Sequence, residues 1–396
     1  MLNSLLFASL LIQAPGVCLH HHAEPPLVAS AWRELDEQVD KRHEADLKAD
    51  AELGAKYAAE VEKEFKLSSR QDAVERVERI GAALAKVAQE TPVRVSWGDR
   101  RLNPFSYRFK VIEEKDVNAF SLPGGFIYVY EGLVDFCESD HELAGVLSHE
   151  IAHAAFRHIA TFQREQSKFS TATLPLIIAI ILGGGREAGN ALTAVQLTNV
   201  ALGSGWSINA EEAADLGGIQ YMARSDYNPV GILTFMERLA RRGGFGDIVD
   251  LGILRTHPPS RQRAATLTKH LQEMGIPIRR SEVTTSFRTI VKPGDAGAVE
   301  GWFGQRRVFR FAGADAIARA DLAAKRLNAF FDEVPELHEV SSLQDGTLLG
   351  RRRPLFQYTA EDAATLGKPL ASLVDEAEAG IKRSLYSLAY RIWDAR

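Results

Sequence analysis

The chain has 396 residues, of which 45% are hydrophobic and 25% charged, and its formal net charge is -5. These values are typical of globular proteins, and the length suggests two or three domains. No basic block with interleaved aromatic residues occurs, which argues against a nucleic-acid partner, and Cys18 and Cys137 alone cannot build a disulfide framework or a cysteine zinc site.

The N-terminal stretch has features of a secretory signal peptide. An apolar run from Leu5 to Ile12 precedes the small-residue triplet Ala14-Pro15-Gly16. No Lys or Arg precedes the run, so a hydrophobic N-terminus without a signal function is the alternative. We expect residues 1–22 to be a signal peptide and the protein to be exported to the periplasm or another extracytoplasmic compartment.

The next segments are expected to alternate between helix and strand. Residues 30–66 are rich in Ala, Glu, Lys and Asp with interspersed Leu and Val, which indicates an amphipathic helix. A second helix is predicted over about 70–90, before Thr91-Pro92. Strand-like stretches, the last of which follows a Pro-Gly-Gly turn, occur at 93–97, 107–112 and 126–130.

A further helix is expected to begin after Ser139. Ser139 and Glu142 have the Ser-x-x-Glu spacing of a capping box, and the helix is predicted to run to about Gln166. The following segment is strongly apolar, but its longest unbroken run, residues 174–182, is too short to span a bilayer. A buried helix, a lid over a cleft and a hairpin that touches a membrane are the open alternatives for this run.

The remainder is predicted to form three helices and then a separate small α+β module. The helices are expected at 208–224, 229–242 and 259–273. The composition changes after about residue 282, which indicates an accessory domain over 300–396. Its expected strands lie at 306–311, 336–341 and 353–358, and its expected helices at 314–331 and 368–393.

The stretch "VLSHEIAHAAFRH" (146–158) places His149, Glu150 and His153 among apolar residues. His149 and His153, at positions i and i+4 of a helix, project from one face and can bind a single zinc ion. From the next position round the helix, the Glu150 carboxylate can reach the water that the metal activates. The alternative is a helix with two hydrogen-bonded core histidines.

A catalytic zinc site usually has three protein ligands and one open position, so a third ligand is expected. Ile159 stands where one class of zinc peptidases has its third His, and His158 is interpreted as a helix-end or packing histidine. Glu211 and Asp215 lie at i and i+4 of a predicted helix. Glu211 can bind the metal while Asp215 hydrogen-bonds a ligand His; a solvated acidic helix start is the alternative.

Four motifs, in order along about residues 70–275, resemble the zinc metallopeptidase family that includes the HtpX heat-shock protease and the CAAX prenyl protease. They are "NAFSLPGGFIYVYEGLV" (118–134), "HEIAHAAFRH" (149–158), "EEAAD" (211–215) and "THPPSRQR" (256–263). The resemblance implies an α+β fold with a mainly helical, zincin-like (gluzincin) peptidase domain and a small sheet. We place this domain at 27–280, before the accessory module.

The resemblance also implies roles for individual residues. One zinc ion per chain is bound by His149, His153 and Glu211. Glu150 acts on the water as general base, and Asp215 orients a ligand His. His257 contacts the tetrahedral intermediate or the open zinc position, with a turn-capping His as the alternative. Arg263 pairs with Glu211 or Asp215, unless it is a surface arginine.

An edge strand in the active cleft is implied as well, at about 118–123. An extended substrate can add to such a strand through main-chain hydrogen bonds, with Asn118 and Ala119 nearest the zinc; an ordinary core strand is the alternative. These features together predict a zinc metalloendopeptidase that acts on unfolded or misassembled envelope proteins, with peripheral membrane contact left open. The rival functions are a chaperone-like module with low turnover and a zinc hydrolase of a non-peptide amide.

Overall fold

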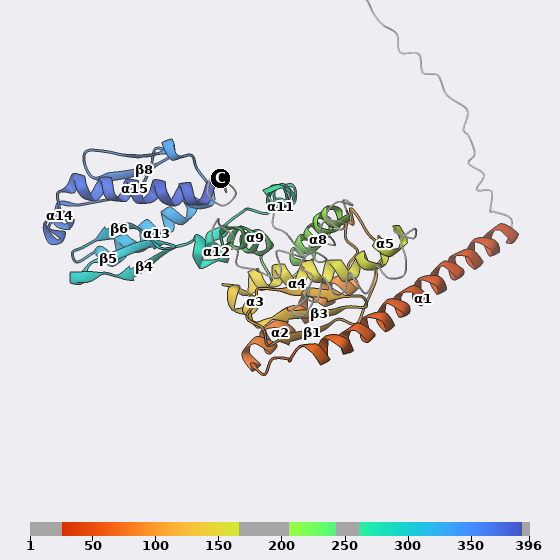
Figure 1. Cartoon of the computed structure of the whole chain (residues 1–396). Helices are drawn as coiled ribbons and strands as arrows, with labels where there is room; N and C mark the ends of the chain where they lie inside the picture. Colours follow the sequence, from red (N-terminus) through yellow and green to blue (C-terminus); the bar gives the residue numbers. More distant parts are fainter. Residues whose placement is uncertain (1–25, 166–205, 243–260, 390–396) are drawn as a thin grey trace, which may run out of the picture. The chain divides into compact units, whose positions relative to one another are not determined.

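The computed structural model describes residues 26–165, 206–242 and 261–389 (Figure 1). The expected signal peptide, the apolar run at 174–182 and His257 lie outside these residues. The chain divides into two compact units, residues 1–46 and 47–396, and helix α1 (Pro26–Glu64) contributes to both. Within the described residues no helix combines the length and apolar character needed to cross a membrane.

The first part of the second unit contains a three-stranded sheet surrounded by helices (Figure 1). Its strands are β1 (Arg108–Ile112), β2 (Ala119–Leu122) and β3 (Phe126–Tyr130). Its helices are α2 (Gln71–Glu90), α3 (Glu131–Phe136), α4 (Asp140–Ala155), α5 (His158–Glu165), α8 (Trp206–Met222), α9 (Val230–Arg242), α11 (Arg261–Glu273) and α12 (Arg280–Val283). This mainly helical arrangement with small sheets confirms the predicted fold class.

The sheet has the order β1-β3-β2, with β1 parallel and β2 antiparallel to the central β3. Side chains along β3 point alternately to opposite faces, as strand geometry requires. Ile127 and Val129 join the core that contains residues of α2 and α4, whereas Tyr128 joins the core that contains Tyr57 and Val61 of α1. Both faces are therefore covered, which explains why "FIYVY" is continuously apolar.

Helix α4 lies at the centre of this part. The Ser139 hydroxyl accepts a hydrogen bond from the backbone N–H of Glu142 at 3.2 Å, which confirms the predicted helix start. The helix packs against α2, α8, α9 and strand β2, and nearly all its side chains are buried. A helix with apolar residues on most of its circumference is expected to lie in such a core.

Two local predictions in this region are wrong. Residues 93–97 form no strand; instead the side-chain amide of Gln220 pairs with the N–H and C=O of Arg94, both at 2.9 Å, where a strand would have a neighbouring strand. The helix that was expected to reach Gln166 ends at Ala155. Arg157 then adopts a left-handed backbone conformation with φ 51°, and α5 starts at the next residue.

The C-terminal part has two antiparallel three-stranded sheets, β4-β5-β6 and β7-β8-β9, and a core of its own. The strands are β4 (Thr289–Pro293), β5 (Val299–Phe303), β6 (Arg306–Phe311), β7 (Val340–Ser342), β8 (Thr347–Gly350) and β9 (Arg353–Gln357). The helices are α13 (Ala316–Asp332), α14 (Ala360–Leu366) and α15 (Leu370–Ala389). Helices α13 and α15 each contact strands of both sheets, so they join the two sheets into one module.

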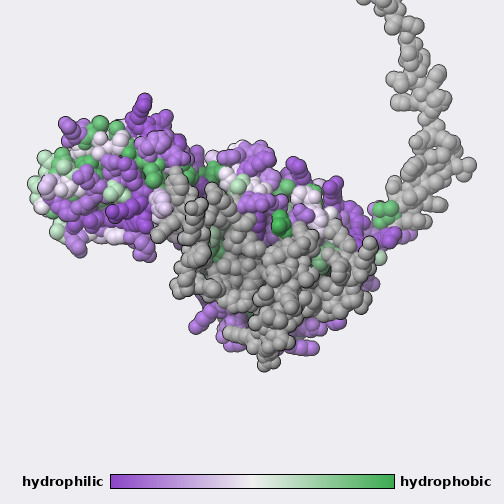
Figure 2. Space-filling view, turned by 45° about the horizontal axis from the view of Figure 1, so that its top comes forward, coloured by the Kyte–Doolittle hydropathy of each residue, from purple (hydrophilic) through white to green (hydrophobic). Residues whose placement is uncertain are grey.

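The predicted strands at 306–311 and 353–358 and both long helices are present in this module, at similar boundaries. The strand predicted at 336–341 begins only at Val340, because Leu337–Glu339 form a 3-10 turn with a capping box. The core also includes Phe287, which precedes the expected start at residue 300. Hydrophilic residues dominate the visible surface of the described parts, with apolar patches between them (Figure 2).

Candidate metal centre

Two packed helices bring the predicted ligands together. His149 and His153 lie one turn apart on α4, with ring centroids 4.7 Å apart, and Glu211 lies on α8, which packs against α4. These three residues form a group whose potential ligand atoms all lie within 4.8 Å of one another. His149 and Glu211 are buried, and His153 is partly buried.

The distances within this group fit a zinc ion. The two Nε2 atoms are 3.0 Å apart, His149 Nε2 is 3.4 Å from Glu211 Oε2, and His153 Nε2 is 3.3 Å from Glu211 Oε1. Ligand atoms at tetrahedral positions about 2.05 Å from one zinc are separated by about 3.3 Å. The separations of the three donors are compatible with three corners of such a tetrahedron, and two imidazoles with one carboxylate are a common donor set for catalytic zinc.

Two of these donors have further contacts: Asp215 contacts His149, and Arg263 contacts Glu211. Asp215 Oδ1 lies 3.0 Å from His149 Nδ1, so it can accept the proton on the nitrogen that faces away from the metal. The Arg263 guanidinium bridges Asp215, at 2.8 Å from each oxygen, and Glu211 Oε2 at 2.9 Å. The structure thus places Arg263 against both acids that the resemblance offered as alternatives.

The charges of the centre favour a cation. Burial raises the pKa of the Asp215 carboxyl, but the adjacent Arg263 outweighs this effect and lowers it to about 2. Burial also lowers the pKa of His149, yet its contacts with Asp215 and Glu211 raise it to about 10. Two buried carboxylates beside one guanidinium leave a net negative charge, which a proton on His149 or a metal ion can balance.

Glu150 lies beside the ligands on α4 and is only 1% exposed. It lines a small cavity of about 40 Å³ together with His149, Asp215 and Arg263. The other lining residues are mostly apolar and come from α4 and α9: Gly145, Val146, Ile232, Phe235, Met236 and Leu239. The Glu150 carboxylate therefore lies next to the candidate metal position in largely apolar surroundings. From there it can exchange a proton with a bound reactant, as a general base or acid does.

Strand β2 is an edge strand of the described sheet and packs against α4. The carbonyl of Asn118 accepts a hydrogen bond from Tyr130 N at 2.9 Å, so its main chain already pairs with β3. Because antiparallel pairing alternates along a strand, the N–H and C=O groups of Ala119 and Ser121 point away from β3. Ser121, which the sequence analysis did not single out, thus joins Ala119 on the side where a further strand would add.

His158 is a second residue whose contacts the sequence analysis missed. It is buried, and its Nδ1 lies 2.8 Å from Nδ1 of His153, while its Nε2 lies 3.2 Å from the carbonyl oxygen of Trp97. Burial lowers the pKa of His158 well below its usual value, which keeps the ring neutral. It packs as predicted, but the residue against which it packs is one of the three candidate metal ligands.

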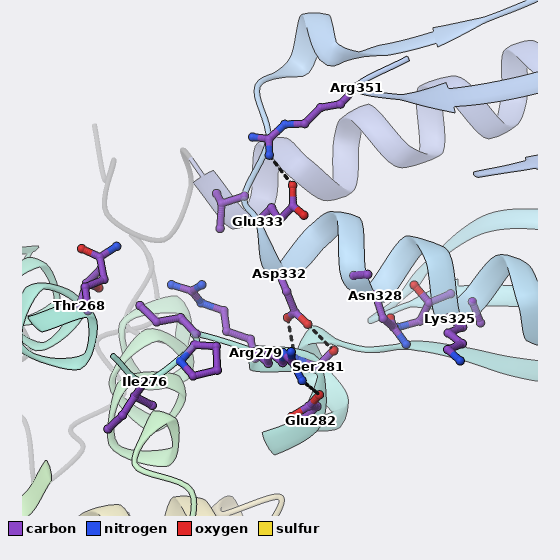
Figure 3. A pocket seen from close by; sticks show the side chains of 18 of the residues that line it. Thr268, Ile276, Arg279, Ser281, Glu282, Lys325, Asn328, Asp332, Glu333 and Arg351 are labelled. Carbon is purple, nitrogen blue, oxygen red and sulfur yellow. Dashed lines mark hydrogen bonds and ion pairs between the residues drawn. The ribbon is translucent and has the colours of Figure 1, made fainter. Parts of the chain in front are cut away.

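A larger hollow of about 1240 Å³ lies elsewhere, between the α11–α12 region and α13 (Figure 3). It shares no residue with the metal centre. Its wall carries paired charges: Arg279 with Glu282, Arg351 with Glu333, and Asp332, which accepts hydrogen bonds from the N–H and hydroxyl of Ser281. Of these, only the Ser281–Asp332 contacts join α12 to α13 of the C-terminal module, and none of the residues named belongs to the candidate metal centre.

Comparison with known proteins identifies the same region. Residues 76–271 match the model of peptidase family M48. Mitochondrial metalloendopeptidase OMA1 of Schizosaccharomyces pombe is 31% identical over 173 residues, covering 43% of this chain and 49% of the relative. The beta-barrel assembly-enhancing protease of Escherichia coli K12 is 28% identical over 171 residues, covering 42% of this chain and 35% of the relative.

A putative beta-barrel assembly-enhancing protease of Vibrio cholerae is 28% identical over 209 residues, which are 50% of this chain and 42% of the relative. The chain therefore spans half or less of the length of these three relatives. All the residues that surround the metal position, from His149 to Arg263, fall inside the matched range. Residues 76–271 of this chain thus form a peptidase family M48 domain.

Proposed function

We propose that this chain is a zinc-dependent metalloendopeptidase that hydrolyses peptide bonds in unfolded or misassembled proteins outside the cytoplasm. The observation that carries the proposal is the arrangement of His149, His153 and Glu211, whose donor atoms are 3.0–3.4 Å apart, with Glu150 beside them. The names of the relatives, a metalloendopeptidase and a protease, support the same class of reaction.

The residues divide the chemistry among them. A zinc ion held by the three donors supplies Lewis acidity, which polarises a carbonyl group and makes water a stronger acid. Glu150 takes a proton from the attacking water and delivers it to the leaving amine. Asp215 and Arg263 hold His149 and Glu211 in place, which orients their donor atoms towards a common metal position.

Strand β2 supports an extended peptide as substrate. Main-chain pairing with Ala119 and Ser121 would select an unfolded segment and require no particular side chain. Unfolded or misassembled proteins offer such segments, whereas compact proteins rarely do. The apolar N-terminal run supports an extracytoplasmic location; the OMA1 relative is named as mitochondrial, so the compartment needs its own test.

The activity test compares wild type, Glu150→Gln and Glu212→Gln with unfolded casein and zinc, followed by mass spectrometry of the products. Glu212 is next to Glu211 on α8 and pairs with Gln262 near the surface, so it is a matched control. We expect wild type and Glu212→Gln to cleave casein at internal peptide bonds, and Glu150→Gln to bind zinc but cleave at least 100-fold more slowly. Equal cleavage by Glu150→Gln would refute the proposed mechanism.

The compartment is tested by fractionating cells that produce the full chain with a C-terminal tag and sequencing the N-terminus of the product. Export predicts a product in the extracytoplasmic fraction that begins near residue 22. A cytoplasmic product with an intact N-terminus would contradict the proposed location and leave the catalytic proposal unaffected.

A further inference from the structure

We propose that His158 is a positioning residue, which fixes the tautomer of His153 so that the Nε2 lone pair of His153 faces the metal. The inference rests on the zinc centre proposed above and adds to it a residue outside the His-Glu-x-x-His pattern. Its basis is a chain of contacts that runs from the Trp97 carbonyl through His158 to His153.

The direction of the hydrogen bonds follows from the first member of this chain. A carbonyl oxygen can only accept, so His158 Nε2, 3.2 Å from Trp97 O, must carry the proton. A neutral imidazole has one N–H, which leaves His158 Nδ1 as an acceptor. His153 Nδ1, 2.8 Å away, must then be the donor. A neutral His153 protonated at Nδ1 has its lone pair on Nε2, the atom that faces His149 and Glu211.

The position of His158 depends on the break between α4 and α5. Arg157 takes a left-handed conformation with φ 51°, which is strained for a residue with a long side chain. The turn brings the His158 ring back towards the ring of His153 on α4. The buried guanidinium is held by Asp50 at 2.6 Å and Asp99 at 3.1 Å. These two ion pairs stabilise a backbone conformation that helix propensity alone would not choose.

The loop that carries Trp97 is attached to the same break. Asp99 N donates to the Phe156 carbonyl at 2.7 Å, which satisfies a carbonyl at the end of α4. Gly98 has φ 112°, and a Cβ at this position would lie only 2.6 Å from Phe156 O and 3.0 Å from the His158 ring. Glycine therefore lets the Trp97 carbonyl approach His158 closely.

The two zinc-binding histidines are thus supported by different groups. His149 has a carboxylate, Asp215, at its outer nitrogen, whereas His153 has a neutral ring. A second carboxylate there would add charge to a buried centre that is already negative. His158 can orient His153 without this cost, and both its nitrogens are satisfied by the arrangement.

The test measures zinc affinity by competition with a chelator for wild type, His158→Phe, His158→Asn and His141→Phe. Phenylalanine keeps an aromatic ring but has no acceptor, so we expect zinc affinity about 10- to 100-fold lower than that of wild type. Asparagine offers an oxygen near the former Nδ1 and should restore most of the affinity. His141, on α4 with His153, accepts a hydrogen bond from Asn228 N away from the centre, and its replacement should leave zinc affinity unchanged.

A second measurement needs no variant. Nitrogen-15 NMR of the histidine-labelled, zinc-loaded wild type should show His158 protonated at Nε2 and His153 at Nδ1. A folded His158→Phe protein with wild-type zinc affinity, or a His158 ring protonated at Nδ1, would overturn the inference. Failure of the wild type itself to bind zinc would instead refute the metal centre, so the two failures are distinguishable.

Discussion

Replacement of Asp215 by Asn is expected to weaken zinc binding by about 10- to 100-fold while the fold is kept. The carboxylate contacts His149 Nδ1 at 3.0 Å and the Arg263 guanidinium twice at 2.8 Å. Asparagine has nearly the same shape but only one acceptor oxygen. Its NH2 group must face either the imidazole N–H or the guanidinium, and both of these are donors.

The sizes of the expected losses in stability and zinc affinity follow from the contacts that Arg263 and His149 keep in Asp215→Asn. Arg263 keeps its contact with Glu211 at 2.9 Å, so the guanidinium is not left without an anion. Loss of Asp215 should therefore cost about 3 kcal/mol of unfolding free energy, the lower end of the range for breaking a buried ion pair. The zinc effect corresponds to about 1.4–2.7 kcal/mol, because the asparagine NH2 group either replaces the acceptor that orients His149 or faces the Arg263 guanidinium that also contacts Glu211.

The assay separates these two effects. Urea unfolding of zinc-free protein gives the structural cost, and chelator competition on folded protein gives zinc affinity. Asp226→Asn, an exposed substitution of the same type, is the control and should change neither quantity. Wild-type zinc affinity in a folded Asp215→Asn protein would refute the orienting role, because the contact with His149 would then have no consequence.

Three further predictions concern the rest of the fold. Burial raises the pKa of Glu138, but hydrogen bonds from Ser286, Thr284 and Thr285 outweigh this effect and lower the pKa to about 2. The stability that Glu138 contributes is therefore complete above about pH 4.5 and is lost as the pH falls towards 2. Thermal melts should show that Glu138→Gln lacks this acid-dependent loss, and parallel pH profiles of the variant and wild type would contradict the prediction. Arg157→Met should lower the unfolding free energy in urea by about 3 kcal/mol, because it leaves two buried carboxylates without this cation, and an unchanged midpoint would disprove the role of the ion pairs. Free zinc at 100 times its dissociation constant should stabilise the protein by about 2.7 kcal/mol, so a chelator should lower the melting temperature, and no shift in calorimetry would argue against binding to the folded state.

The parts of the site that the sequence predicts are those fixed by local geometry. The capping residue Ser139 and the spacing of His149 and His153 depend only on the pitch of one helix. Glu211 and Asp215 are also one turn apart, but their approach to α4 follows from the packing of two helices. Only the resemblance to a known family pointed to that contact in advance.

The errors come from contacts between distant residues. Arg94 lies in a strand-like sequence, but the side chain of Gln220 takes the place of a neighbouring strand. The end of α4 depends on Asp50 and Asp99, which lie far from it in the sequence. Their ion pairs with Arg157 stabilise a left-handed conformation that helical periodicity does not predict. The role of His158 depends on that same break, so no sequence spacing could have assigned it.

In the C-terminal module the sequence analysis missed β4, β5 and β8. Strands β4 and β5 contain Pro293 and Gly301, which have low strand propensity, and β8 is only four residues long. Each forms because a neighbouring strand pairs with it and because α13 or α15 covers the sheet. Such stabilisation belongs to the packed module and leaves little trace in the local sequence.

The central claim is that His149, His153 and Glu211 hold one zinc ion, and metal analysis of purified wild type, Glu211→Gln and Glu212→Gln tests it most directly. The two variants make the same chemical change at adjacent positions of α8, and Glu211 alone of the two belongs to the donor group. We predict one zinc per chain in wild type and Glu212→Gln, and a large loss in Glu211→Gln. Full zinc content in Glu211→Gln, or none in wild type, would contradict the proposed centre.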